Sequence, residues 1–440
     1  MKSNGSHDPL RTPRGSFELR RFSSDAALVI IGAGIGNAFS YVFHFVLSRR
    51  LGPGAYGTLV TFLSIGVMVS VVGNSLGTVA MQETAKLWAT HLEAAIASFV
   101  RRTLPFALAA SIAIALALIV ASMPLAAYLH VQQPLLWALL GAYVAVQILA
   151  AYARGAAQGA HRFVIFALSF VGEGAVKVAL AVWLVILGFG VAGALGGLIA
   201  SAVTVLAIAL PPIISGGTAR TWQQGEQRKL GRSALLVMAV TGAVNALLYI
   251  DMLFAKHHFR AEVAGYFGAA GTVARTIPYA ASFIALILMP KAAAAIHVSR
   301  DSLARVLALA AGMTAACVIA ALALINLLAR PIIGATYGPA FTGAAPILGA
   351  YTVDEALFAL WASANACLVA VGRYEVFGYL AVATVVEAVA MAFFGSTPLR
   401  LLSIAIVVNA ALVPTVWLLA LRTLRAVPQA ASPLRAENVL

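Results

Sequence analysis

Charged residues are scarce in this chain. Asp, Glu, Lys and Arg together make up 10% of its 440 residues, whereas 62% are hydrophobic. Soluble domains carry about 25% charged residues. A soluble fold with so few charges would lack the polar groups needed to cover its surface, so the composition excludes an ordinary soluble domain. The apolar excess requires the lipid bilayer as a second solvent.

Cysteine is also scarce, and the sequence motifs of nucleotide-binding loops are absent. The two cysteines, Cys317 and Cys367, fall in apolar stretches and form no metal or disulfide pattern. No GxxxxGK[ST] loop and no Ser-His-Asp or Cys-His pattern occurs, so we expect neither an enzyme nor a bound cofactor. The glycines of LVIIGAGIGNA at 28–38 mimic a dinucleotide fingerprint. No acidic residue follows at the expected distance, and close helix packing explains these glycines better.

Acidic residues are outnumbered by basic ones, and the formal net charge is +14. Such an excess can indicate nucleic-acid binding. Here the basic residues are scattered in short segments between apolar runs, which is typical of the cytoplasmic loops of membrane proteins. We therefore expect membrane lipids, and no nucleic acid, as partners of this chain.

Long apolar runs are abundant. A membrane-spanning helix needs about 20 mostly apolar residues, and twelve runs qualify. They are 26–48, 57–79, 102–122, 134–153, 164–186, 189–210, 233–255, 265–289, 304–329, 344–369, 376–395 and 401–421. The sequence therefore predicts an all-α polytopic membrane protein with twelve transmembrane helices.

Polar segments divide the chain. Residues 1–24 are polar and basic, which predicts a disordered cytoplasmic tail. The longest internal polar stretch, 211–232, predicts a cytoplasmic linker between an N-terminal six-helix bundle, 25–210, and a C-terminal one, 233–425. A second cytoplasmic tail, 426–440, follows. With the N-terminus in the cytoplasm, 21 of the 29 Lys and Arg residues fall in cytoplasmic segments. The positive-inside rule thus predicts that both termini are cytoplasmic.

The two halves show a faint repeat. Tyr56 and Tyr266 stand in similar hairpins 210 residues apart, and Arg162 and Arg373 stand in similar turns 211 residues apart. Two matches at nearly one offset indicate a duplicated six-helix unit. Because six is even, both copies share one topology. We expect the two bundles to be related by a pseudo-two-fold axis along the membrane normal.

Ionisable residues within the expected spans are the candidate functional residues, because a charge at the bilayer centre costs about 2.5–3.5 kcal/mol on insertion scales. Glu173 and Lys177 are four residues apart and share one helix face. They form either an internal ion pair or part of a transport site. Arg275 has no acidic residue three or four positions away, which favours an uncompensated anion site facing a wet cavity. Asp251, near the end of its span, has either an interfacial or a functional role.

Three further acids complete the candidates. Asp354 and Glu355 are adjacent in one expected span, and Glu387 lies in the next. Carboxyl groups at such depth persist mainly where they face a cavity or a partner. We expect Glu173, Asp354 and Glu387 to be the possible ion-coupling residues.

Several stretches resemble the polysaccharide transport family, the oligosaccharide and O-antigen flippases of the multidrug/oligosaccharidyl-lipid/polysaccharide exporter superfamily. They are LSRRLGPGAYGTL at 47–59, the segment 245–290, GATYGPAFTGAAPILGAY at 334–351 and NACLVAVGRYEVFG at 365–378. The resemblance covers most of residues 24–425. It implies two six-helix bundles around a central V-shaped cavity in the bacterial inner membrane.

The resemblance also implies a function and a site. It implies flipping of an undecaprenyl-diphosphate-linked oligosaccharide to the periplasmic face for polysaccharide export. Basic cavity residues would meet the diphosphate or acidic sugars, and by position these are Arg275 and Lys177. A polysaccharide polymerase or glycosyltransferases would be partners. The alternatives are an ion-coupled drug exporter, a cell-wall precursor flippase, and a non-transporting scaffold of a polysaccharide-synthesis complex.

Overall fold

The computed structural model describes residues 14–90, 92–215, 227–296 and 299–426, and these residues are almost entirely helical. The first half contains α1 (Arg14–Val69), α2 (Val71–Ala89), α3 (Glu93–Val120), α4 (Ser122–Leu129), α5 (Pro134–Gly159), α6 (Phe163–Ile186) and α7 (Gly190–Ile214). The second half contains α8 (Gln227–His258), α9 (Ala261–Ala274), α10 (Thr276–Ala295), α11 (Arg300–Leu327), α12 (Ala329–Thr336), η1 (Pro339–Ala344), α13 (Ala345–Ala370), α14 (Val376–Phe394) and α15 (Pro398–Ala426).

Twelve membrane crossings follow from these helices. Among the described residues, 10 helical segments are long and apolar enough to span a bilayer. One of them contains two crossings, because α1 turns sharply at Gly52, whose φ of 72° suits glycine. One further crossing consists of α9 and α10, which are separate helices broken at Arg275. The predicted all-α, twelve-span fold is confirmed.

The ends of the predicted segments shift by several residues. Helix α1 begins at Arg14, so part of the expected N-terminal tail, 1–24, is helical. Helix α7 continues to Ile214 and α8 begins at Gln227, which shortens the expected linker. The remainder of that linker and most of the segment 426–440 lie outside the described residues.

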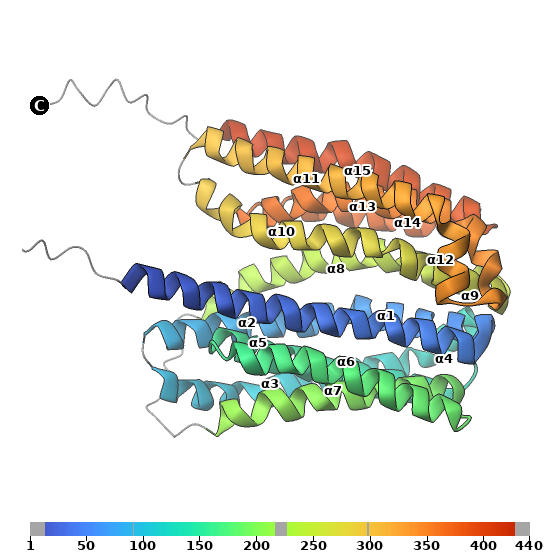
Figure 1. Cartoon of the computed structure of the whole chain (residues 1–440), viewed down its shortest axis with the longest axis horizontal. Helices are drawn as coiled ribbons and strands as arrows, with labels where there is room; N and C mark the ends of the chain where they lie inside the picture. Colours follow the sequence, from blue (N-terminus) through green and yellow to red (C-terminus); the bar gives the residue numbers. More distant parts are fainter. Residues whose placement is uncertain (1–13, 91, 216–226, 297–298, 427–440) are drawn as a thin grey trace, which may run out of the picture.

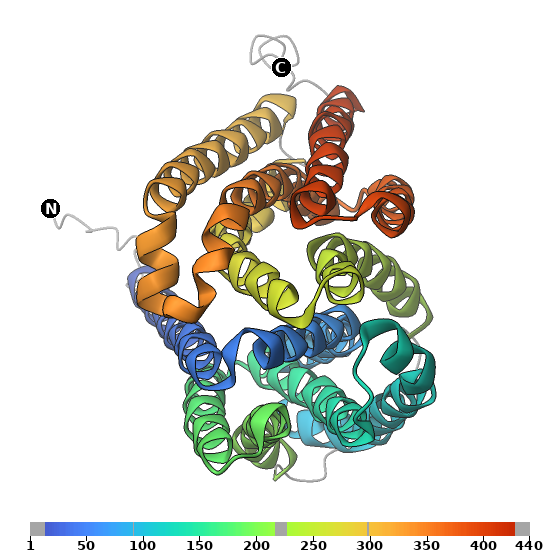
Figure 2. The ribbon, with the colours of Figure 1, turned by 90° about the vertical axis from the view of Figure 1, so that its right-hand side faces the viewer.

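The two halves repeat the same order of elements. Helix α5 begins at Pro134 and α13 at Ala345, 211 residues later, and the third span of each half is followed by a short helix, α4 or α12. Figure 1 shows α1–α7 on one side of the molecule and α8–α15 on the other. Figure 2 looks along the bundle and shows the two groups of helices with α1 at their boundary.

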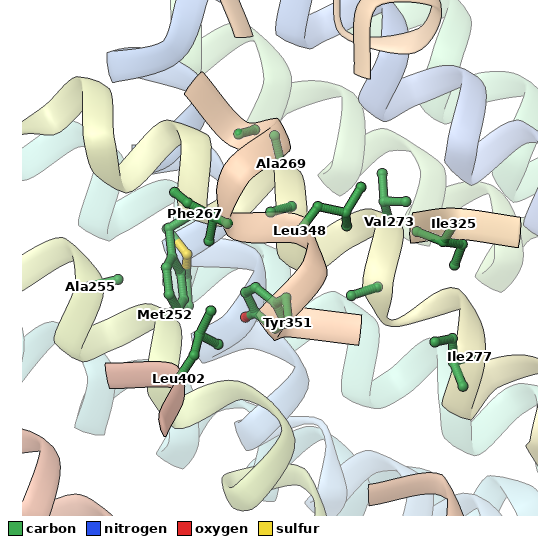
Figure 3. Packing of buried hydrophobic residues seen from close by; sticks show 14 of the residues in the cluster. Met252, Ala255, Phe267, Ala269, Val273, Ile277, Ile325, Leu348, Tyr351 and Leu402 are labelled. Atoms are coloured by element: carbon green, nitrogen blue, oxygen red, sulfur yellow. The ribbon is translucent and has the colours of Figure 1, made fainter. Parts of the chain in front are cut away.

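The outward faces are as apolar as the cores. Among the described residues, Phe106, Val120, Leu327 and Phe393 are each more than 70% exposed. Exposed apolar surface of this kind requires lipid around the bundle. Inside the second half, Met252, Phe267 and Tyr351 pack against one another from α8, α9 and α13 (Figure 3).

The two halves meet at one end of the bundle, which we call the closed end. It contains the α1 turn, α4, the start of α9, and α12 (Figure 1). The ring of Tyr56 lies 5.5 Å from that of Phe341, and Nδ1 of His257 donates to the carbonyl oxygen of Tyr128 at 2.7 Å. Helix α1 begins and α15 ends at the opposite end, which we call the open end.

Candidate substrate cavity

A cavity of about 520 Å³ lies between the halves. Its walls come from α1 and α6 of the first half and from α8, α9 and α10 of the second. The lining includes Asn37, Ser40, Tyr41, His44, Lys177, Tyr249, Thr272, Arg275, Tyr279 and Phe283. The predicted central cavity is therefore present. Tyr56, which is hydrogen-bonded to the lining residue His44, is fully buried, whereas Tyr279 and Phe283 are 47% and 42% exposed.

Arg275 lies at the break between α9 and α10 and is 3% exposed. Its Nη2 donates to Asp251 Oδ1 at 2.8 Å and to the hydroxyl of Tyr351 at 2.8 Å. Its Nε donates to the carbonyl oxygen of Leu248 at 3.0 Å and lies 3.3 Å from Glu355 Oε1. The hydroxyl of Tyr351 donates in turn to Asp251. One guanidinium thus ties three helices, α8, α9 and α13, into one network.

The expectation that the charge of Arg275 is uncompensated is wrong, although its side chain does line the cavity. Its acidic partners, Asp251 and Glu355, come from neighbouring helices, which spacing along its own helix does not reveal. A buried guanidinium held by two carboxylates has little capacity left for a phosphate. Asp251 is buried in this network, which excludes the interfacial role, one of the two alternatives that the sequence left open.

Lys177 is the uncompensated cation of the cavity. Its Nζ donates to Ser40 Oγ at 2.7 Å, and it has no ion-pair partner among the residues that the structure describes. Glu173 instead pairs with Arg154 of α5, with Nη2 and Oε2 2.7 Å apart. Of the two alternatives left open by the sequence, an ion pair between Glu173 and Lys177 is therefore not formed, although the two do share one face of α6.

The remaining candidate acids are buried in the second half. Asp354 Oδ1 accepts from Nδ2 of Asn409 at 2.8 Å. Glu387 is 0% exposed, and neither of its carboxylate oxygens has a hydrogen-bond partner within the described part of the chain. Arg275 pairs with Asp251 and Glu355, and within the described part of the chain no basic group pairs with Asp354 or Glu387, so the acids of this region outnumber its bases. A region with this excess of acid is suited to holding protons or cations.

Sequence reasoning overlooked Arg154 and the tyrosines. Arg154 falls just beyond an expected span, yet it lies within α5 and its guanidinium is 4.0 Å from the ring of Phe170 on α6. The rings of Tyr249 and Tyr351 lie 4.5 Å and 5.4 Å from the guanidinium of Arg275. The hydroxyls of Tyr249 and Tyr279 share a hydrogen bond, and both residues line the cavity. They connect the Arg275 network to the cavity wall. Aromatic residues in apolar runs are typical of a protein core. No sequence signal therefore distinguishes these tyrosines from ordinary core residues.

No protein-family model and no curated protein matches this chain. Solved structures do match. A multidrug resistance MATE family transporter of the MOP superfamily in its inward-facing conformation gives a TM-score of 0.75 at 14% identity, over 89% of this chain and 96% of that one. An outward-facing conformation of such a transporter gives 0.67 at 15% identity, over 92% and 97%. A MOP superfamily transporter from Pyrococcus furiosus, described as having a binding pocket of reverse polarity, gives 0.63 at 15% identity, over 92% and 96%.

The helices, the central cavity and these matches define a class. The chain is a multi-pass membrane protein with the two-bundle fold of MOP superfamily transporters. Within that superfamily, the structural neighbours reported above include MATE family transporters. At such low identity the likeness is one of fold, so the substrate must be argued from the cavity itself.

Proposed function

We propose that this protein is a secondary transporter that flips an undecaprenyl-diphosphate-linked oligosaccharide across the bacterial inner membrane. The observation that carries the proposal is Lys177. It is the one lysine or arginine on the described cavity wall that makes no ion pair, so its ammonium group is available to an anion. A diphosphate is an anion that such a group binds through charge-assisted hydrogen bonds.

The walls of the cavity suit an amphipathic substrate. Tyr41 of α1 faces the same cavity as Tyr279 and Phe283 of α10, and the latter two side chains are substantially exposed. An apolar, aromatic wall near the open end supports a polyprenyl chain that remains in the bilayer while the head group enters. In this scheme the open end faces the cytoplasm, where lipid-linked glycans are made. A polysaccharide polymerase and glycosyltransferases are the expected partners.

Coupling to an ion gradient is assigned to the buried acids. Glu387 is favoured, because a carboxylate without a partner in the apolar interior costs several kcal/mol and binding of a proton removes that cost. Asp354, with its amide partner, is the second candidate. Glu173 is less suited, since its carboxylate is already held by Arg154.

An ion-coupled drug exporter is the second candidate function. The multidrug transporters that share the fold support it. The ammonium group of Lys177 argues against cationic drugs, and the Pyrococcus furiosus transporter indicates that pocket polarity differs within this superfamily. A cell-wall precursor flippase would use the same chemistry for a different lipid-linked glycan. A non-transporting scaffold would gain nothing from an uncompensated lysine in a cavity.

Binding to the purified protein in detergent tests the proposal. Farnesyl diphosphate serves as a short-chain probe, and a lipophilic cation serves as the drug-like probe. We expect wild-type protein to bind the diphosphate, Lys177→Arg to bind it within a few fold, and Lys177→Met to bind it at least about tenfold more weakly. Lys291→Met, which removes an exposed lysine outside the cavity, should bind as wild type. Diphosphate binding that is equal in Lys177→Met and wild type, or binding of the cation alone, would exclude the proposal.

A further inference from the structure

A second cavity, of about 320 Å³, lies within the first half. It is lined by α2, α5 and α6, and its volume is in the range of small-molecule sites. Its lining is Asn74, Gly77, Thr78, Met81, Gln147, Ala151, Arg154, Gly155, Gln158, Phe166 and Phe170. Arg154 of this lining pairs with Glu173, which precedes Lys177 of the central cavity by one turn of α6. This chain of charged residues connects the second cavity to the central one.

The walls of this cavity are held in fixed positions by backbone contact between α2 and α5. A Cβ added at Gly155 would overlap the carbonyl group of Gly77, and one at Gly159 would overlap that of Met81. Gly73 and Gly77 on α2, and Gly155 and Gly159 on α5, are each four residues apart, which is the GxxxG spacing of closely packed membrane helices. This close approach sets the positions of the side chains beside the glycines.

Those side chains are amides without protein partners. Asn74, Gln147 and Gln158 make no side-chain hydrogen bond within the described part of the chain. Oε1 of Gln147 is shielded from solvent as well as unpartnered. A buried amide oxygen left unbonded costs about 1–3 kcal/mol. Asn74 is exposed and Gln158 half-buried, so Gln147 carries the argument. A shielded, unbonded amide oxygen on the wall of a cavity indicates that a polar ligand satisfies it.

The charges of this cavity select the kind of ligand. Arg154 binds Glu173 and Ser169 through Nε and Nη2, and its Nη1 has no partner among the described residues. Because Glu173 compensates the charge of Arg154, the cavity offers many donors and acceptors but no net charge. This environment contrasts with the central cavity, whose wall carries the ammonium group of Lys177. It favours a neutral ligand rich in hydroxyl groups over a phosphate.

We infer that this cavity is the sugar subsite of the transporter, which binds a hydroxyl-rich glycosyl group of the substrate while Lys177 holds its diphosphate. The inference rests on the proposed function. The two cavities are connected through Arg154 and Glu173, so one lipid-linked glycan can occupy both at once. Phe166 and Phe170 supply apolar surface beneath the ring of the sugar. The subsite then distinguishes one glycan from another. The central cavity binds the diphosphate, which every substrate of this kind shares.

The test compares two probes on the same purified protein. They are farnesyl diphosphate and the same lipid carrying a glucose disaccharide on its terminal phosphate. We expect the wild type to bind the glycosylated probe about tenfold or more tightly. In Gln147→Leu and Asn74→Leu the ratio of the two affinities should fall toward about one, while affinity for the bare diphosphate stays within about twofold. Gln132→Leu, at an exposed position outside the cavity, should keep the wild-type ratio.

The outcomes separate the inference from the proposed function. Lys177→Met should weaken both probes equally and leave their ratio unchanged. A wild-type ratio near one, or a ratio that Gln147→Leu leaves intact, overturns the sugar subsite while the diphosphate site stands. Absence of binding of either probe to folded wild-type protein overturns both.

Discussion

Nη2 of Arg275 lies 2.8 Å from Oδ1 of Asp251, although 24 residues separate them along the chain. Both side chains are about 4% exposed, so each neutralises the other in an apolar interior. Removing one partner of a buried pair strands the other charge, which costs about 3–5 kcal/mol. We therefore expect Arg275→Met and Asp251→Leu each to lower the protein level in membranes and the melting temperature in detergent.

The double variant Arg275→Met/Asp251→Leu distinguishes a stranded charge from lost packing. Glu355 remains beside position 275, so we expect recovery of stability over either single variant, but not full recovery. Arg373→Met, which removes an exposed ion pair with Glu375, should leave the melting temperature nearly unchanged. A double variant no more stable than the worse single one would contradict this account of Arg275.

Labelling of single cysteines tests the orientation of the bundle in the membrane. In a chain whose Cys317 and Cys367 are replaced by serine, we expect Gln132→Cys to react with an impermeant maleimide added to intact cells. Lys291→Cys should react only after the membrane is opened. Both positions are exposed. Gln132 directly follows α4, which is at the closed end, and Lys291 belongs to the last part of α10, which ends at the open end (Figure 1). The structure argues against a probe at Leu129, which is fully buried. Labelling of Lys291→Cys in sealed cells would reverse the predicted orientation.

The sequence predicted the number of spans because hydrophobic length alone decides whether a helix crosses a bilayer. It also predicted the repeat, since Tyr56 and Tyr266 keep their places in duplicated hairpins. It did not predict that α1 and its turn form one continuous element, or that the eighth span breaks at Arg275. Those features depend on local backbone geometry and tertiary contacts, which the length of an apolar run does not record.

The candidate site was predicted only in part, for a related reason. Helical spacing correctly placed Glu173 and Lys177 on one face of α6. It could not show that Arg154, on the preceding span, is a closer partner for Glu173 than Lys177 is. In the same way Arg275 has no acid one turn away in its own helix and two acids on other helices. Periodicity reports the faces of one helix, whereas ion pairs in a bundle form between helices.

Closure of the bundle at the closed end depends on Gly265. A Cβ at this position would overlap the carbonyl group of Pro53, so the backbones of α9 and α1 could not approach as they do. We expect Gly265→Ala to separate the halves at the closed end and favour a cavity open there. A cysteine at Ser40, which lines the central cavity, should then react severalfold faster with a maleimide added from that side.

Gly54→Ala provides the matched control for Gly265→Ala. Its added Cβ would lie 3.5 Å from Ala261 Cβ, an ordinary contact across the same pair of helices. Reactivity of the Ser40 cysteine should therefore stay at the level of the parent protein. Unchanged reactivity in a well-folded Gly265→Ala variant would mean that the α1–α9 contact does not hold the closed end shut.

Glu387 offers the sharpest test of ion coupling. Its carboxylate is fully buried and makes no hydrogen bond to the described residues, so Glu387→Gln strands no partner and should change stability by about 1 kcal/mol or less. If the proton of Glu387 drives transport, an inward proton gradient across proteoliposomes should accelerate flipping in the wild type and have no effect in Glu387→Gln. Glu375→Gln, which alters an exposed acid, should keep the response. A full gradient response in correctly folded Glu387→Gln would remove Glu387 from the coupling mechanism and leave Asp354, whose hydrogen bond to Asn409 can also respond to protonation, as the next residue to test.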